Sequence, residues 1–104
     1  MSIQTITLDA TQTSTLASVG TSAVTIMSLC NYSAVSQTVS IHIVPQGSLP
    51  DDTNIFVKDI TIVAGDTFIL YQGGEKIILD DGDFISAIAS NAAAVTAITS
   101  YMVV

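Results

Sequence analysis

The chain has 104 residues, of which two are basic and nine are acidic, and its formal net charge is −7. It contains no arginine, one histidine and one cysteine, so most side chains that serve catalysis or metal binding are scarce. This balance argues against nucleic-acid binding, because lysine and arginine at phosphates supply most of that affinity, and against an anionic membrane surface. The classes of partner that this charge balance leaves open are proteins, neutral glycans and cations. The length predicts one domain over residues 1–104.

The first twenty residues are polar and carry a single charge, on Asp9. A short strand is expected at residues 4–8, whereas the Ser-, Thr- and Gly-rich stretch 11–21 is typical of an extended loop. Residues 1–20 are therefore predicted to be either an N-terminal arm or an edge strand of the domain.

Residues 23–31 alternate with a period of two, which indicates a half-buried strand. Val24 and Ile26 share the face that we assign to the core, and Met27 and Leu29 lie on the opposite face. A turn is expected to follow this strand at residues 31–36.

A second alternating strand is predicted at residues 37–45, with Val39, Ile41 and Ile43 on the face that we assign to the core. The stretch 46–54, which contains glycine, proline and two aspartates, is expected to be a loop.

Six further short strands are expected, at residues 55–57, 59–63, 67–71, 76–79, 84–89 and 94–103. Turns are expected at 64–66, 72–74 and 80–83, and a hairpin is expected to join the last two strands around residues 90–91. Eight or nine short strands at this spacing predict an all-β, single-domain antiparallel β-sandwich with jelly-roll-like topology.

The last segment allows two other interpretations. Residues 84–104 carry no charge and are long enough to cross a bilayer, but the polar pair Ser90 and Asn91 falls near the middle, so we expect no membrane span. The same residues also fit a helical stripe, yet the β-branched content of 95–104 favours a strand.

The densest group of possible metal ligands is the turn with Asp80, Asp81 and Asp83 around Gly82. Clustered carboxylates are weak candidates for a Ca²⁺ site, because Ca²⁺ takes six to eight oxygen ligands and the spacing matches no EF-hand. We interpret the segment as a polar turn in which Gly82 adopts a positive φ and the carboxylates accept hydrogen bonds from backbone N–H groups.

Catalytic arrangements are missing from the sequence. His42 has no second histidine to share a metal ion or a proton-transfer step, and no serine lies in a Gly-x-Ser-x-Gly elbow. Cys30 has no basic neighbours in the sequence, so we expect a small buried hydrophobe rather than a reactive thiol. The sequence therefore predicts no enzyme activity, no cofactor and no metal ion.

Apolar residues recur on the strand faces that we place opposite the core, where a soluble monomer would carry lysine and glutamate. We take five residues of these faces as interface candidates: Met27, Leu29, His42, Val44 and Val63. The sequence predicts an obligate assembly that buries these faces between subunits. The alternative is a sandwich whose own loops cover both faces of its strands.

Three segments carry a resemblance to a known family: IVAGDTFIL at residues 62–70, EKIILDDGDFISA at 75–87 and VTIMSLCNYS at 24–33. They resemble the turns and strands of small virion structural proteins of tailed bacteriophages. The resemblance extends over residues 21–104. It departs from many members in lacking a long N-terminal arm, for which only residues 1–20 are available.

This resemblance implies a β-sandwich component of the virion, assembled in the host cytoplasm and without catalytic residues. It favours a capsid decoration (cement) protein, a homo-oligomer and most often a homotrimer, bound to the major capsid protein. A tail, neck or baseplate component is the alternative. A glycan- or Ca²⁺-binding β-sandwich module is a second alternative, although the chain has no tryptophan and its three tyrosines are scattered.

Overall fold

The computed structural model describes residues 2–70 and 77–103. These residues form nine strands: β1 (Ser2–Thr7), β2 (Thr13–Ala17), β3 (Ser22–Asn31), β4 (Gln37–Val44), β5 (Ile55–Ile62), β6 (Thr67–Leu70), β7 (Ile77–Leu79), β8 (Phe84–Ala89) and β9 (Val95–Val103). The prediction of an all-β chain with eight or nine short strands is confirmed. No helix of the described part has the length and hydropathy that crossing a bilayer requires.

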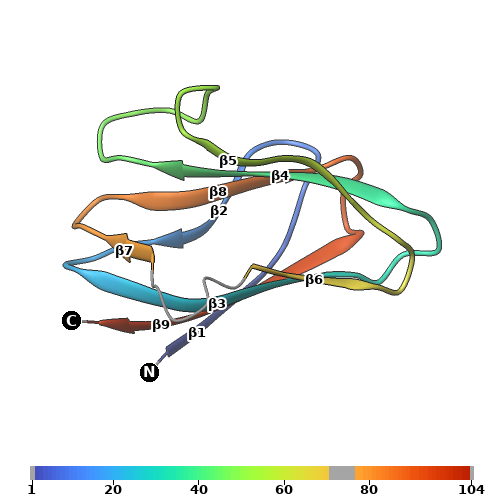
Figure 1. Ribbon diagram of the computed structural model, residues 1–104, viewed down its shortest axis with the longest axis horizontal. Coiled ribbons are helices and arrows are strands. Elements are labelled where there is room, and N and C mark those ends of the chain that lie inside the picture. The colour runs from blue at the N-terminus through green and yellow to red at the C-terminus, as the bar shows by residue number, and fades with distance from the viewer. Residues whose placement is uncertain (1, 71–76, 104) are drawn as a thin grey trace.

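The strands form two antiparallel sheets that lie face to face as a β-sandwich (Figure 1). Sheet A has the order β1-β9-β3-β6, and β7 also pairs with β3, beyond the end of β6. Sheet B has the order β2-β8-β4-β5. β1 and β2 are therefore edge strands of the two sheets.

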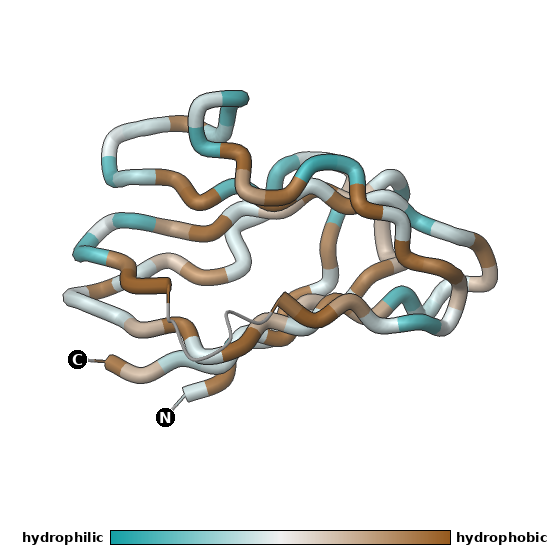
Figure 2. The backbone as a smooth tube through the Cα atoms, viewed as in Figure 1, coloured by the Kyte–Doolittle hydropathy of each residue, from teal (hydrophilic) through white to brown (hydrophobic). Residues whose placement is uncertain are grey.

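The core lies between the sheets and consists of aliphatic side chains from both of them. Met27, Leu29 and Val95 of sheet A face Ile41 and Ile85 of sheet B, and none of the five is more than 1% exposed. Strands whose side chains alternate between the core and the outside bury one face in this way. In Figure 2 the most hydrophilic residues gather in turns and loops, and few lie along the strands of the lower layer, sheet A.

The expected loop at residues 11–21 is wrong, because it contains strand β2. Thr15 and Leu16 of this strand are buried, and the Thr15 hydroxyl donates to the Ile85 carbonyl at 3.2 Å. The segment is a strand because it pairs with β8. The sequence did not reveal this strand, because its Ser- and Thr-rich residues include too few apolar ones to show a period of two.

The two short strands expected at 55–57 and 59–63 are one strand, β5. Asp59 adopts a φ of 50°, and the register with β4 shifts near it. A bulge of this kind keeps a strand continuous while it interrupts the alternation of side chains, and the sequence prediction took that interruption for the end of one strand and the start of another.

The expected hairpin of the last two strands is also wrong. β8 belongs to sheet B and β9 to sheet A, so residues 90–94 cross from one sheet to the other. Ala93 in this crossing has a φ of 55°, and its N–H donates to the Leu8 carbonyl at 3.3 Å. The predicted turn at 72–74, and the ends Tyr71 and Lys76 of two predicted strands, lie outside the described residues.

Candidate interaction surface

Met27 and Leu29, two of the interface candidates, lie in the core with no exposed surface. Their assignment to the outer face is wrong. The register of β3 with β9 shifts between Val24 and Ile26, so both Val24 and Met27 point into the core while Ile26 is exposed. Because a one-residue shift moves all later side chains to the other face, a bulge at Thr25 was enough to invert the prediction.

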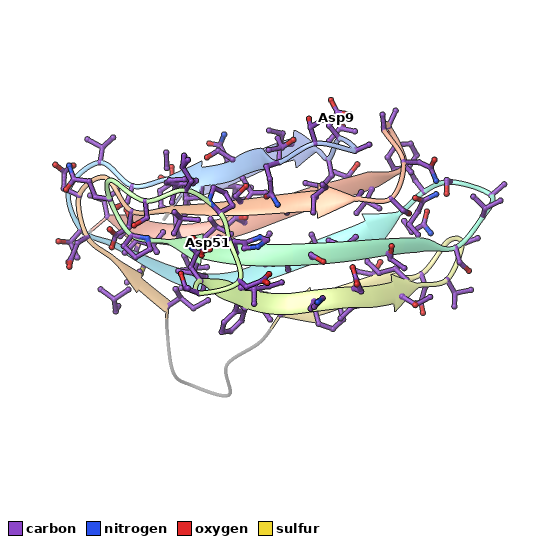
Figure 3. The ribbon with its side chains drawn as sticks, turned by 90° about the horizontal axis from the view of Figure 1, so that it is seen from above. Asp9 and Asp51 are labelled. Carbon is purple, nitrogen blue, oxygen red and sulfur yellow. The ribbon has the colours of Figure 1, made fainter. Side chains whose placement is uncertain are left out.

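His42 and Val44 lie on the outer face of sheet B but are also buried, with exposed fractions of 6% and 0%. The 45–54 loop, which carries Asp51, lies over this end of β4 (Figure 3). The Ile43 N–H donates to the Asn54 carbonyl at 3.0 Å, which ties the end of the loop to the sheet. The alternative in which the chain's own loops cover a strand face therefore describes this region.

His42 packs against the strands on either side of β4. Nδ1 of His42 is buried and has no hydrogen-bond partner among residues 2–70 and 77–103. Its cross-strand neighbours are Ser86 and Ile55, and the Ser86 hydroxyl donates instead to Oε1 of Gln12 at 2.7 Å. In the described part of the chain the His42 ring is therefore packed between neighbouring strands, and its Nδ1 is not paired with a second titratable group.

The acidic turn at residues 80–83 uses its carboxylates to hold neighbouring backbone. Asp83 accepts hydrogen bonds from the N–H groups of Gln46 and Asp80 at 2.9 and 3.0 Å, and Asp81 accepts one from Gly20 at 2.8 Å. Gly82 has a φ of 88°, which favours glycine. The segment is thus a turn of the expected kind. In the part of the chain that the structure describes, no three His, Cys, Asp or Glu side chains are placed to hold a metal ion.

The 45–54 loop contains one carboxyl group with a shifted pKa. Hydrogen bonds from the side chain and then the backbone of Thr53 lower the pKa of Asp51 from its ordinary value of 3.8. Because the folded-state pKa is the lower one, ionised Asp51 stabilises the loop above a pH of about 4. This contribution is lost as the pH falls through the folded-state pKa.

We therefore expect the Asp51 carboxyl group to titrate in the folded protein with a midpoint below pH 3.8. The chemical shift of its carboxyl carbon, followed by NMR as a function of pH, measures this midpoint. Thr53→Val removes the hydroxyl donor, which is the largest cause of the shift, and should move the midpoint upward. A midpoint at or above 3.8 in the unaltered protein, or no movement in the variant, would contradict this assignment.

The main exposed apolar surface is the outer face of sheet A. Cross-strand pairing places six large apolar side chains on it: Ile3, Ile26, Ile69, Ile78, Ile98 and Met102. Their exposed fractions range from 38% to 68%. Small uncharged residues occupy the positions between them: Thr5, Thr7, Ala23, Ser28, Cys30, Thr67, Thr96 and Ser100. We call these residues together the isoleucine face.

No charged residue of the described ranges 2–70 and 77–103 belongs to the isoleucine face. The acidic side chains of the described residues lie instead in the 45–54 loop, in the turn at 80–83, after β1 at Asp9, in β5 at Asp59 and before β6 at Asp66. A soluble acidic protein normally spreads charge over its exposed sheet faces. This face is therefore the part of the surface best suited to contact another protein.

Two residues from the sequence predictions lie near or on this surface. Val63 is the one interface candidate that is well exposed, at 57%, but it follows β5 in the turn before β6 and is not part of the isoleucine face. Cys30, which we expected to be buried, is partly exposed on the face between Thr67 and Thr96. The sequence prediction missed the isoleucine face because it placed Ile26 in the core and Met27 and Leu29 on the outside of β3.

Comparison with known proteins found no matching family model, no similar curated protein and no similar solved structure.

Proposed function

We propose that this chain is a non-enzymatic structural protein of a bacteriophage virion, most specifically a capsid decoration protein. In this role it binds copies of itself and the major capsid protein, and it stabilises the head by adding contacts across subunit boundaries. The observation that carries the proposal is the isoleucine face, an exposed sheet face without charge on a protein with a net charge of −7. Like-charged copies can approach one another, or a shell, most closely where that charge is absent.

The size of the face supports a contact of useful strength. Strand spacing and rise give a face four strands wide and nine residues long an area of roughly 600 Å². If about half of this is apolar, its burial contributes roughly 7 kcal/mol before the costs of association. A single contact of this size is modest, but repetition over many copies on a shell would oppose internal pressure.

The jelly-roll topology that we propose is supported by the strand order. β1, β2, β3 and β4 lie alternately in sheets A and B, and β8 and β9 again lie in opposite sheets. Such crossings distinguish a jelly roll from a meander of hairpins within one sheet. Jelly rolls occur in viral capsid proteins but also in lectins and cupins, so the fold is compatible with the proposal and does not by itself select it.

The proposal is tested by counting copies in purified particles of a phage that encodes the chain, by quantitative mass spectrometry. Hundreds of copies per particle support the decoration role. Copy numbers of about six or twelve, typical of closed rings, would instead favour the tail, neck or baseplate alternative. Absence from the particle would contradict both.

Charged substitutions on the isoleucine face provide a sharper test. Ile98→Asp places a carboxylate at the middle of β9, where 40% of the side chain is already exposed. We expect the protein to fold normally and its copy number in particles to fall at least about ten-fold, since burying an unpaired charge in a contact costs several kcal/mol. Thr61→Asp, at an exposed position of β5 in sheet B, is the matched control and should be incorporated normally. Equal incorporation of both variants would rule out the face as the contact.

A further inference from the structure

Each sheet has two edges, and open edges tend to pair with other chains unless charges, bulges or short length protect them. β5 carries Lys58 and Asp59 together with its bulge. β2 has five residues and a register shift. The second edge of sheet A consists of β6 and β7, which have only four and three residues. Three of the four edges in the described structure therefore have a protective feature.

The fourth edge, β1, has none of these features. Its six residues contain no charge, proline or glycine, and its register with β9 is continuous from Ser2 to Thr7. Five of the six residues are exposed. β1 is therefore the strand best suited to add a further strand to sheet A.

The hydrogen bonds at the end of β1 show which backbone groups point outward. The Leu8 N–H donates to the Val95 carbonyl of β9 at 2.8 Å. On the other side of β9, the Tyr32 N–H donates to the Ala94 carbonyl at 3.0 Å, so alternate residues of β9 bond to β1 and to β3. Because backbone groups alternate in direction along an antiparallel strand, those of Ile3, Thr5 and Thr7 point away from β9. None of these three residues has another backbone partner within the described ranges.

We propose that β1 pairs antiparallel with β1 of a second copy of this chain, so that sheet A continues across a two-fold axis. This inference goes beyond the proposed function, because it rests on the backbone of an edge and not on the isoleucine face. A two-fold contact closes with two copies. It therefore predicts a dimer, whereas the resemblance to virion proteins implies a trimer.

Opposed residues of an antiparallel pair must share a face, so the two-fold axis must pass beside a residue and not between two residues. The axes at Thr5 and at Gln4 overlap the two copies of β1 over the greatest length, because these two residues lie at the centre of the strand. An axis at Thr5 opposes Ile3 with Thr7 of the second copy and uses the outward groups of all three residues. It forms about six backbone hydrogen bonds, two for each pair. An axis at Gln4 forms about four, so the structure favours the axis at Thr5.

Charge and area also favour a second copy as the occupant. The nearest charge, Asp9, would lie roughly 25 Å from its counterpart in this register, well beyond the screening distance of about 8 Å at physiological salt. The edge buries only a strip of roughly 200 Å² per copy, from strand length and sheet separation, which is about a quarter of the area that each partner buries in a standard interface. We therefore expect a weak, reversible dimer, which is best detected by a covalent trap.

The trap uses single cysteines in a Cys30→Ser background under a glutathione redox buffer. With the axis at Thr5, two Thr5→Cys side chains face each other across a Cα separation of about 5.5 Å, within the range that a disulfide spans. Two Gln4→Cys side chains are then diagonal, about 7–8 Å apart, and should not bridge. We expect Thr5→Cys to form the dimer disulfide at least about ten-fold faster than Gln4→Cys. Faster bridging by Gln4→Cys would overturn the register, and no bridging by either would overturn the pairing.

A second pair of variants tests the backbone bonds without a new thiol. Thr5→Pro removes an N–H that points away from β9, so β1 should remain in sheet A, whereas Thr5→Val keeps the N–H. In sedimentation velocity over about three decades of concentration, we expect Thr5→Val to dimerise like the unaltered protein and Thr5→Pro to stay monomeric. Dimerisation of Thr5→Pro would contradict the proposal. Ile98→Asp separates the two hypotheses, because it should lose incorporation into particles but keep the dimer at β1.

Discussion

Replacing Asn31 by aspartate is expected to destabilise the fold by about 3–5 kcal/mol, which corresponds to a fall in Tm of roughly 15–25 °C for a domain of about 100 residues. Asn31 is the last residue of β3, and its side chain has no exposed surface. Its amide Nδ2 donates to the carbonyl oxygens of Val35 and Ile62 at 2.9 and 2.8 Å. The substitution would put a carboxylate oxygen against both of these acceptors.

The large effect follows from the number of segments that meet at this side chain. Oδ1 of Asn31 accepts hydrogen bonds from the N–H and the hydroxyl of Ser33, so the amide holds the turn between β3 and β4 as well. Ile62 is the last residue of β5 in sheet B, so the same amide links the two sheets. Each buried carbonyl that loses its donor costs about 1–3 kcal/mol, before any cost of burying the new charge.

The matched control is Asn91→Asp, which makes the same chemical change at an exposed position. Its amide donates a single hydrogen bond, to Oε1 of Gln37 at 3.2 Å, and the Ser90 hydroxyl still donates to that oxygen in the variant, so we expect a loss of about 1 kcal/mol. The Asn31→Asp variant should also regain stability as the pH falls, because burial raises the pKa of the new carboxyl and its neutral form avoids the charge penalty. Urea unfolding at several pH values measures both effects. Equal, small losses in the two variants would contradict a structural role for Asn31.

Much of the fold was predictable because alternation between apolar and polar residues survives wherever a strand has one face in the core. This holds for residues 37–44, where Val39 and Ile41 face the core as expected, and for 84–89, which is a strand with the predicted bounds. The turn at 80–83 was predictable for a different reason, because its aspartates and glycine have direct conformational preferences.

The interaction surface was not predictable because it depends on which side of each strand meets the other sheet. Alternation in β3 defines two faces, but the bulge between Val24 and Ile26 changes their assignment partway along the strand. Ser40 and His42 are polar and alternate correctly with the core positions, yet both are buried. Ser40 exchanges hydrogen bonds with Asp59 at the bulge of β5, and the 45–54 loop folds back over the end of β4 that carries His42. Both features depend on tertiary contacts that no local pattern of residues encodes.

The corrected assignment of β3 makes a quantitative prediction about two neighbouring positions of sheet A. Leu29→Ala is expected to destabilise the protein by about 3–4 kcal/mol, because it leaves a cavity in the core where the side chain had no exposed surface. Ile98→Ala, on the outer face and 40% exposed, is expected to cost less than about 1 kcal/mol.

For incorporation into particles we expect the reverse order, with the larger loss in Ile98→Ala and the smaller in Leu29→Ala. Leu29→Ala removes no exposed surface, so the folded variant should be incorporated into particles like the unaltered protein, whereas Ile98→Ala reduces the apolar area of the isoleucine face. Denaturant midpoints and copy number in particles, compared for the two variants, therefore separate a core position from a contact position. If Leu29→Ala left the denaturant midpoint unchanged and lowered incorporation, the original outward assignment of Leu29 would be correct and the β3 bulge would be misplaced.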